Sequence, residues 1–384
     1  MSNLVFATPP ASTPRHAALR KEVRDFLGSA LAGVSPAMRA SSWFNFDAEF
    51  SRRLGARGWI GMTWPKQYGG SERSAHDRYI VVEELLAAGA PVGAHWIADR
   101  QSGPLLLRFG SEQQRQAILP RIIRGECYFC IGMSEPDSGS DLAAVRTRAE
   151  PIKGGGYRVN GSKIWTTFAH VANYMILFCR TDDRSDDRHQ GFSQFLVDLS
   201  TPGISVRPIL DMGGRHHFNE VVFQNVLLEE GALIGERGDG WSQVTSELAF
   251  ERSGPERFLS SYVLLTELVR ALGRNPDQRA AIAIGRLTSH LIVLRRLSRS
   301  VAGMLESGGA PGLQAALVKD VGNTLEQELP EIARLLLNVE PDSGSTDPYV
   351  STLAETILQA PIYSLRGGAR EVLRGIIARG LDVR

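Results

Sequence analysis

The chain contains 384 residues, of which 43% are hydrophobic and 22% are charged. This length allows roughly two or three domains and a core large enough to enclose a cofactor. A formal net charge of +1 gives no reason to expect a nucleic acid or an anionic membrane as a partner.

Periodicity divides the chain into three parts after a tail of about 12 residues, which is rich in Ser, Thr and Pro and expected to be loose. Apolar residues recur at helical spacing in His16–Ala32, Phe46–Gly58, Ala75–Ala88 and Gly103–Ile123. Near residue 125 the period changes to two, which predicts strands at Gly156–Val159, Lys163–Thr166, Tyr174–Arg180, Gly191–Val197, Val206–Ile209 and Glu220–Leu228. Helical spacing returns in Ser242–Leu272, Asp277–Glu306, Pro311–Leu337, Val350–Leu358 and Gly368–Gly380. The short strands favour a small antiparallel sandwich or barrel between two helical parts.

No apolar run approaches the ~20 residues that a helix needs to cross a bilayer, so we expect no membrane span. The N-terminus also lacks the apolar region of a signal peptide, which predicts a cytoplasmic protein. The three cysteines of the chain fit a reducing compartment.

Two residue pairs could in principle bind a metal or undergo redox chemistry, but a structural role explains each pair more simply. Cys127 and Cys130 have the spacing of a redox pair or of half a zinc site, but they lie in a strand-like stretch and no second pair completes a zinc site. His216 and His217 have no third ligand at a suitable spacing, and we place them on a β-turn at the surface. We therefore predict no metal site.

The segment Tyr128–Thr147 carries the most specific signal in the chain. An alternating apolar strand, Tyr128–Met133, ends in a turn formed by Pro136–Ser140. Small residues in the turn let backbone N–H groups approach a ligand closely, and the hydroxyls of Ser134 and Ser140 can bond polar ring edges or phosphates. Such a strand and loop is typical of a site that cradles a flavin.

Four segments in order carry a resemblance to a known family. Ser134–Asp141 resembles the Thr/Ser-Glu-Pro-x-x-Gly-Ser-Asp flavin signature of acyl-CoA dehydrogenases. Gly58–Pro65 (Gly-Trp-x-Gly-x-x-Trp-Pro), Gly161–Thr167 (Gly-Ser-Lys-Ile-Trp-Thr-Thr) and Gly367–Arg374 (Gly-Gly-Ala-Arg-Glu-Val-Leu-Arg) match further segments of the same family. The resemblance implies an α+β fold with an N-terminal α-helical domain (1–125), a middle antiparallel β domain (126–235) and a C-terminal α-helical bundle (236–384).

The resemblance also implies a flavoenzyme of lipid or fatty acid catabolism that dehydrogenates an acyl-CoA thioester with FAD. A carboxylate removes the proton α to the thioester, and a hydride passes from the β-carbon to flavin N5. Because the α-proton is weakly acidic, the site must stabilise an enolate-like oxygen and hold its base in a dry pocket, where desolvation raises the carboxylate's pKa.

Glu251 is the predicted catalytic base. The family places its base at one of two positions, and the position near the C-terminus is Gly367, which cannot act. The other lies just before an arginine in the first helix after the β domain, which matches Glu251. The alternative is a surface glutamate paired with Arg252 or Arg257, and Glu247 and Glu256 are neighbouring carboxylates.

The resemblance assigns further residues to ligands. Met133 and Ser134 are expected at the isoalloxazine edge, and Ser140 at a phosphate or at the CoA-facing loop. Trp165 would cover the ring, or else belong to the β-domain core, and the Thr167 hydroxyl would bond N5 or O4. The segment that closes over the cofactor contributes Gly367, Gly368 and Glu371. Ser140 and Arg252 are assigned to substrate binding.

Two departures from the family pattern affect the flavin site. Ala369 stands where the family often has Thr, which removes one hydroxyl. Arg274–Arg279 stands where many members have Arg-x-x-Phe-Gly reaching the FAD of a neighbouring subunit. Arg274 or Arg279 is the expected substitute.

Partners and alternatives also follow from the resemblance. An electron-transfer flavoprotein is the expected acceptor, and the expected assembly is a homodimer or homotetramer, or a heteromer with a paralogous chain. A non-catalytic or half-site subunit, an acyl-CoA oxidase and a flavin monooxygenase of the same fold remain alternatives. The helix position of Glu251, with Gly254 adding space nearby, suggests a branched or bulky acyl group.

Overall fold

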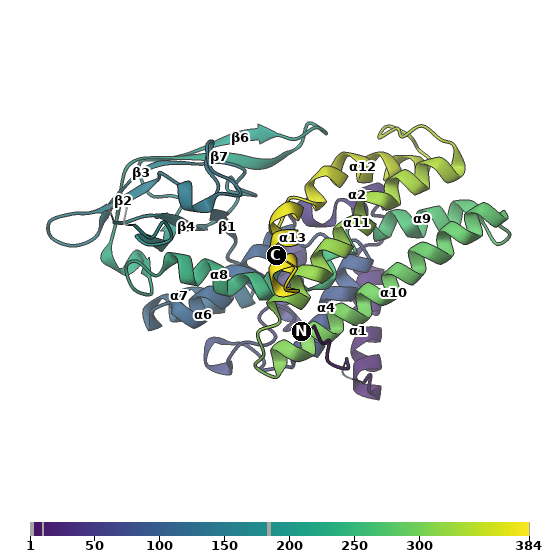
Figure 1. The fold of residues 1–384 in the computed structure, drawn as a ribbon, viewed down its shortest axis with the longest axis horizontal. Helices are drawn as coiled ribbons and strands as arrows, with labels where there is room; N and C mark the ends of the chain where they lie inside the picture. Colours follow the sequence, from purple (N-terminus) through teal and green to yellow (C-terminus); the bar gives the residue numbers. More distant parts are fainter. Residues whose placement is uncertain (1–3, 10, 183–185, 384) are drawn as a thin grey trace. The chain divides into compact units, whose positions relative to one another are not determined.

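The computed structural model describes residues 4–9, 11–182 and 186–383, and the side chains of residues 247–251 lie outside the described part (Figure 1). Contacts between Cα atoms divide the chain into two units. The first unit, here the helical unit, consists of Met1–Phe50, Arg73–Gly93 and Leu248–Arg384. The second, here the sheet unit, consists of Ser51–Glu72 and Ala94–Glu247.

The helical unit contains α1 (Pro14–Ala30), α2 (Pro36–Ala40), α4 (Ala75–Ala87), α9 (Tyr262–Leu272), α10 (Gln278–Glu306), α11 (Gly312–Leu337), α12 (Pro348–Tyr363) and α13 (Arg370–Gly380). Side-chain caps define where two of these helices begin. Thr13 accepts a hydrogen bond from the backbone N–H of His16 at the start of α1, and Asp277 accepts one from Ala280 at the start of α10. In α1 the buried side chains lie on one face, at Leu19, Val23, Phe26 and Leu27.

The N-terminal tail is ordered in its described part, contrary to the sequence-based expectation. Phe6 packs against a cluster of α10 and α11 side chains that includes Val301 and Val318. The Gln314 side chain donates to the carbonyl of Val5 over 3.0 Å, and Ser300 Oγ donates to that of Ala7 over 2.5 Å. The composition of the tail predicted a disordered segment. Composition does not reveal that Phe6 packs against apolar side chains of its own unit.

The sheet unit contains the helices α5 (Gly93–Ile97), α6 (Gly103–Phe109) and α7 (Glu112–Ile123), while α3 (Ala48–Ala56) and α8 (Gly240–Glu251) cross the unit boundaries. Its strands are β1 (Phe129–Gly132), β2 (Arg148–Pro151), β3 (Tyr157–Lys163), β4 (Tyr174–Arg180), β5 (Phe192–Asp198), β6 (Ile204–Leu210), β7 (His216–Leu228) and β8 (Leu233–Ile234). Within the described residues they form one sheet in the order β6-β7-β3-β2-β4-β5-β8, with β1 paired to β4.

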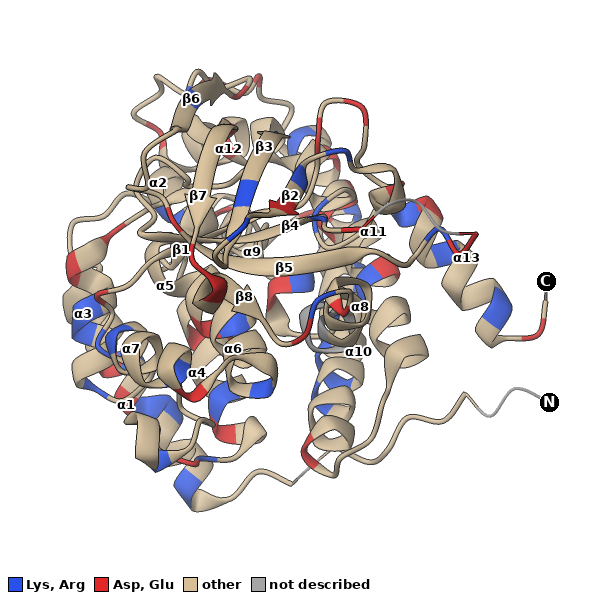
Figure 2. Cartoon of the chain, turned by 90° about the vertical axis from the view of Figure 1, so that its left-hand side faces the viewer, with Lys and Arg blue, Asp and Glu red and all other residues tan. Residues whose placement is uncertain are grey.

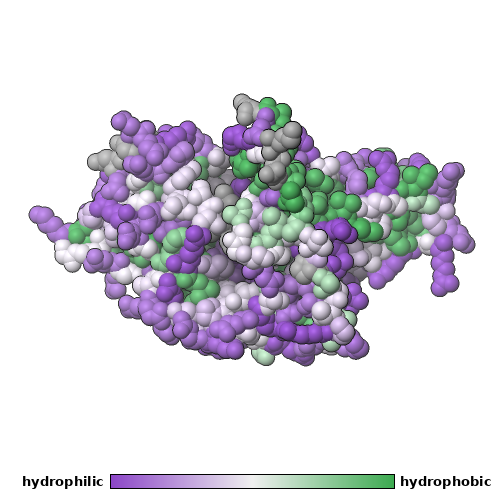
Figure 3. All heavy atoms as spheres, turned by 60° about the horizontal axis from the view of Figure 1, so that its bottom comes forward, coloured by the Kyte–Doolittle hydropathy of each residue, from purple (hydrophilic) through white to green (hydrophobic). Residues whose placement is uncertain are grey.

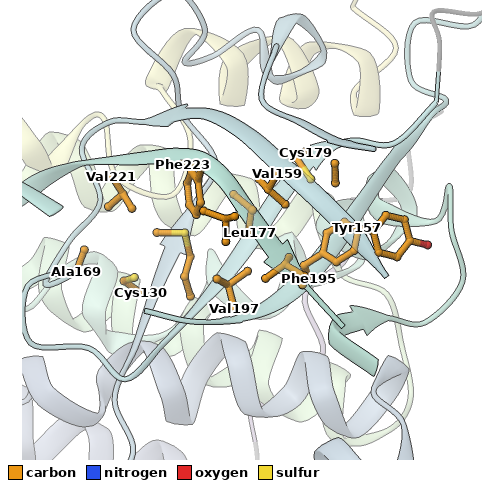
Figure 4. Packing of buried hydrophobic residues seen from close by; sticks show 14 residues of the cluster. Cys130, Tyr157, Val159, Ala169, Leu177, Cys179, Phe195, Val197, Val221 and Phe223 are labelled. Carbon is orange, nitrogen blue, oxygen red and sulfur yellow. The ribbon is translucent and has the colours of Figure 1, made fainter. Parts of the chain in front are cut away.

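Most strand pairs are antiparallel, but β4 pairs in parallel with β1 and with β2. Apolar side chains of one sheet face pack into a buried core (Figure 4), among them Cys130, Val159, Leu177, Phe195, Val197, Val221 and Phe223. Helices before the sheet, a middle β-sheet and helices after it confirm the predicted fold class.

Two local predictions in the sheet unit are wrong. Lys163–Thr166 is not a strand, because β3 ends at Lys163 and Trp165, with φ 58°, lies outside the extended region of backbone conformation. His216 and His217 are not on a surface turn: they begin β7, and His217 is 5% exposed. The alternation of polar and apolar residues in the sequence does not reveal that Trp165 adopts a left-handed backbone conformation.

The cysteines are inert in their environment. All three are buried, and burial raises the pKa of Cys127 to about 11 and that of Cys179 to about 12. The pKa of Cys130 is also raised by burial. Thiols held in the neutral form favour the structural interpretation over redox use.

Charge and hydropathy on a larger scale are unremarkable. Figure 2 shows acidic and basic positions interspersed along the elements, in agreement with the small net charge. Within the described residues, no helix is both long enough and apolar enough to cross a membrane.

Candidate functional site

The flavin-signature loop begins where β1 ends at Gly132. Glu135 and Ser138 bond each other's backbone, with N···O distances of 2.7 and 3.0 Å, and Ser138 Oγ donates to the carbonyl of Asp141 over 2.6 Å. At Gly132 a Cβ atom would lie 2.6 Å from the sulfur of Met175, so the loop needs glycine at its start. Met133 and Ser134 are half-buried and Ser140 is exposed. The loop is therefore a tight, internally bonded turn with an accessible serine.

A buried ion pair anchors this loop to β3. Lys163 Nζ lies 2.8 Å from Glu135 Oε1 and donates to the carbonyl of Met133 over 3.0 Å. The lysine side chain is 0% exposed and the glutamate side chain 8%. Glu135 also accepts from the backbone N–H groups of Arg146 and Thr147, at 2.6 and 2.9 Å. Every one of these contacts fixes the loop conformation.

The electrostatics of the pair favour a charged glutamate. Burial alone would raise the pKa of Glu135, but the Lys163 charge and the hydrogen bonds from Lys163, Thr147 and Arg146 together hold that pKa below its usual value. The carboxylate therefore stays charged at neutral pH and keeps the loop attached to β3.

The segment after β3 presents an aromatic face. Trp165 is 57% exposed, and its indole meets Phe218 edge-on with 5.9 Å between ring centroids. The alternative that Trp165 belongs to the β-domain core is therefore wrong. Trp165 and Phe168 have φ angles of 58° and 59°, unusual for bulky residues. Strain of this kind persists where a fixed geometry serves a function.

The loop and this segment lie together in the sheet unit. The N–H of Ile164 donates to the carbonyl of Ser134 over 2.9 Å, and the Lys163–Glu135 pair links the same two stretches. Thr167 is half-buried, and the buried hydroxyl of Thr166 has no hydrogen-bond partner within the described residues. An exposed indole beside a polar loop with spare backbone and hydroxyl groups fits a planar cofactor with an apolar face and polar edges, as FAD is.

In the helical unit, Gly367 and Gly368 form the turn between α12 and α13. Their φ angles are 69° and 103°, which only glycine adopts easily. A Cβ at Gly367 would lie 2.6 Å from the Arg257 guanidinium, and one at Gly368 would lie 3.2 Å from that of Arg252. Arg252 Nε donates to the carbonyl of Gly367 over 3.2 Å. Thus the residue that follows Glu251 is bonded to the turn that carries the family's other base position.

A second buried ion pair fixes the start of this turn. An Arg366 terminal nitrogen lies 2.9 Å from Glu326 Oε2 and donates to Ser260 Oγ over 2.6 Å. The Arg366 guanidinium also lies over the rings of Trp43 and Tyr363, 4.3 and 4.8 Å from their centroids. The turn is therefore held by side chains from several helices of its unit.

The remaining predicted site residues of the helical unit lie in or next to α8, α10 and α13. Glu251 is the last residue of α8, and its side chain lies outside the described part. Glu371 is exposed in the first turn of α13, and Ala369 is the N-cap of that helix without a side-chain hydrogen bond. Arg279 donates to the carbonyls of Leu335 and Leu336, at 2.6 and 3.4 Å. Arg274 is exposed.

One ground for expecting a bulky substrate is wrong. Gly254 does not add space, because the carboxyl group of Glu256 occupies the position that a Cβ would take. Glu256 is 3% exposed. The absence of a side chain at Gly254 accommodates a neighbouring buried carboxyl rather than a ligand-sized space.

Sequence reasoning missed four charged anchors, Glu135, Lys163, Glu326 and Arg366. The first two lie inside quoted motifs, and a lysine ending an alternating strand was a usable signal for a buried partner. Glu326 lies mid-helix in α11, where local sequence does not distinguish it from a surface residue. No group of three or more His, Cys, Asp or Glu residues suited to a metal ion occurs in the described parts of the chain.

Comparisons with known proteins agree on one family. Residues 13–126 match the profile described as acyl-CoA dehydrogenase, N-terminal domain, and residues 130–226 match the middle domain of the same family. The chain is 31% identical to acyl-CoA dehydrogenase IpdE1 of Mycobacterium tuberculosis, over 94% of this chain and 95% of the relative.

Solved structures extend the similarity to the whole chain. The Tcur3481–Tcur3483 steroid ACAD aligns with a TM-score of 0.86 and 27% identity, covering 97% of this chain and 98% of that one. The ChsE4–ChsE5 complex from Mycobacterium tuberculosis aligns with a TM-score of 0.84 and 28% identity, again over 97% and 98% of the two chains.

Proposed function

The chain belongs to the acyl-CoA dehydrogenase family of oxidoreductases, and from this premise we propose that it removes two hydrogens from the α and β carbons of an acyl-CoA thioester, with FAD as cofactor and Glu251 as base. Members of this family are flavoproteins. The hydrogen bond from Arg252 to the carbonyl of Gly367 carries the proposal, because it ties the residue after Glu251 to the turn where other members hold their base.

The residues of the chain have separate tasks in this reaction. The Glu251 carboxylate takes the α-proton. The indole of Trp165 provides an apolar face, and the loop from Met133 to Ser140, with Thr167, provides polar groups for the cofactor's edges and phosphate. Gly367, Gly368 and Glu371 close the site. Bound FAD supplies the acceptor for the hydride that leaves the β-carbon.

The cofactor and the reaction can be tested together. We expect purified protein, or protein reconstituted with FAD, to show a flavin absorbance spectrum that bleaches anaerobically on addition of an acyl-CoA. Failure to bind FAD under any condition would contradict the cofactor assignment. A flavin that no acyl-CoA reduces would instead support the non-catalytic subunit.

We propose a branched or bulky acyl group as substrate. The helix position of Glu251 supports it, as does the similarity to a protein described as a steroid ACAD. Flavin reduction by straight-chain, branched and ring-bearing acyl-CoAs tests the proposal. Fastest reduction by a short straight chain would contradict it.

We propose an oligomer as the working form, either of identical chains or with a paralogous chain. The ChsE4–ChsE5 complex, to which the chain is similar, is an assembly of two different chains. On α10 the side chains of Ile282, Ile292 and Val293 are 56%, 62% and 53% exposed. Figure 3 shows hydrophobic residues gathered among hydrophilic ones on the face it presents. Exposed Arg274 is the candidate to reach a neighbouring FAD.

Oligomeric state and electron acceptor have direct tests. Light scattering of the chain alone, and again after co-expression with a paralogous chain, distinguishes homomer, heteromer and monomer. An electron-transfer flavoprotein should reoxidise the substrate-reduced enzyme faster than oxygen does. Rapid hydrogen peroxide formation would favour the oxidase alternative.

A further inference from the structure

Asn219 in β7 bonds Thr166 of the aromatic segment through both its side chain and its backbone. Its side-chain nitrogen donates to the carbonyl of Thr166 over 2.9 Å, and its backbone carbonyl accepts the N–H of Thr166 over 3.0 Å. Asn219 is 0% exposed. Thr166 stands between Trp165 and Thr167, so these two bonds fix the residue that separates the two predicted flavin contacts.

Two histidines set the orientation of that carboxamide. The second hydrogen of the Asn219 nitrogen faces His170 Nδ1 at 3.2 Å, and the Asn219 side-chain oxygen lies 2.7 Å from His216 Nε2. The His217 carbonyl is farther, at 3.5 Å. Each polar group is matched only if His170 Nδ1 accepts and His216 Nε2 donates, which both neutral rings allow.

The two rings also support each other. His170 and His216 are stacked with 3.8 Å between centroids and 22° between their planes. Two positive charges at this distance would repel, so the stack disfavours protonation of both rings at once. This network of hydrogen bonds and ring stacking requires both histidines, His170 and His216, and Asn219.

We propose that Asn219 is a positioning residue for the flavin-facing segment Trp165–Thr167, and that neutral His170 and His216 set the orientation of its carboxamide. The inference rests on the proposed function, since it assigns the segment to FAD. A proton on His170 Nδ1 would point an N–H at the Asn219 amide N–H. The amide must then turn, and the Thr166 carbonyl loses its donor.

The surroundings of His170 determine the pH at which this happens. His216 from β7 stacks on His170. Arg121 from α7 and Tyr174 and Asp198 at the ends of β4 and β5 line a cavity of about 610 Å³ together with His170. Burial and the neighbouring His216 lower the pKa of His170. The network is therefore intact at neutral pH and is lost as the pH falls through the lowered pKa of His170.

The experiment measures FAD affinity by quenching of flavin fluorescence between pH 5 and 8. Asn219→Leu keeps the side-chain volume and removes every polar contact of the side chain, and we expect about tenfold weaker FAD binding at pH 7.5. His170→Phe keeps the stacked ring and removes the titrating nitrogen. For wild type we expect affinity to fall toward pH 5, and for His170→Phe we expect this fall to disappear.

His189→Phe is the matched control, because His189 stacks on Trp241 with 4.2 Å between centroids, in the same unit. It should bind FAD like wild type at every pH. Because Asn219 is fully buried, thermal melts check folding, and the His170→Phe result stands if Asn219→Leu fails to fold. Wild-type affinity in Asn219→Leu, or a wild-type pH dependence in His170→Phe, would overturn the inference alone. Wild-type protein that never binds FAD would overturn the proposed function and the inference with it.

Discussion

At the residue scale, the buried ion pair Lys163–Glu135 attaches the flavin-signature loop to β3 and fixes the conformation of the loop. An apolar pair of similar volume could be as stable, because burying two charges costs about what their attraction returns. The charged pair adds hydrogen bonds to the Met133 carbonyl and from the N–H groups of Arg146 and Thr147. These bonds fix the backbone of the flavin-signature loop, which packing alone would leave less defined.

Removing one partner should therefore be costly. We expect Lys163→Met to lower the free energy of unfolding by about 3–5 kcal/mol, since it leaves a buried carboxylate without its partner. The matched control is Lys66→Met, which breaks the exposed pair with Glu72, whose N···O distance is 3.5 Å, and should cost less than about 1 kcal/mol. Urea unfolding measures both. Equal small losses would mean that the pair does not hold the loop.

The pair also has a predicted pH dependence. The Glu135 pKa is held below its usual value, so its stabilising effect is complete above that usual value and is lost as the pH falls through the lowered pKa. In Glu135→Gln this part of the acid sensitivity should be absent, and acid unfolding curves of the two proteins compare it directly. An unchanged acid dependence would contradict a charged Glu135.

The turn at Gly367 gives another residue-scale prediction. In Gly367→Glu the introduced carboxylate begins from a backbone with φ 69° and lies beside the Arg257 guanidinium. The cation would pair with it and lower its pKa, which makes it a poorer base. We expect Glu251→Gln/Gly367→Glu to reduce its flavin no faster than Glu251→Gln in a stopped-flow assay. Recovery of the rate would show that this position can still hold the base.

At the element scale, periodicity and capping predicted most of the fold. β4 has the predicted bounds Tyr174–Arg180, and α10 begins one residue after the predicted start, because Asp277 is its cap. The predictions failed where a conformation depends on partners distant in sequence. Phe6 packs the tail against α10 and α11, and Asn219 bonds Thr166 in the segment after β3. Such pairings are not visible in any local window.

The same limit applies to the candidate site. Motif resemblance identified Ser134, Trp165 and Gly367, which lie in accessible or strained positions. It did not identify the buried Glu326–Arg366 pair, since neither residue type nor spacing distinguishes a buried ion pair from a solvated one. Candidate ligand-contacting residues could be proposed from the sequence, whereas the buried residues that hold their backbone required the structure.

Helix α13 provides the element-scale prediction. Its N-cap is Ala369, with extended φ and ψ of −61° and 147° and no side-chain bond to the first turn. Ala369→Thr should cap the helix and raise the free energy of unfolding by about 1 kcal/mol. Ala378→Thr, inside the same helix, is the control and should instead lower stability by about 0.5 kcal/mol through lower helix propensity. Denaturant midpoints compare them, and equal effects would argue against a capping role.

At the scale of the whole molecule, the residues proposed for the reaction belong to both units. The sheet unit holds the loop and the aromatic segment assigned to the cofactor, and the helical unit holds the glycine turn and the arginine that follows the proposed base. Family membership joins these parts into an acyl-CoA dehydrogenase. We propose that the chemistry depends on Glu251, because Gly367 has no carboxyl group.

The rate of flavin reduction in Glu251→Gln tests this claim most directly. With FAD bound and a good acyl-CoA substrate, we expect anaerobic stopped-flow reduction about 10²–10⁴ times slower than in wild type, because a positioned general base contributes roughly that factor. FAD content should stay at the wild-type level, and Glu247→Gln, one helical turn earlier, should keep a near-normal rate. A near-normal rate in Glu251→Gln would contradict the account.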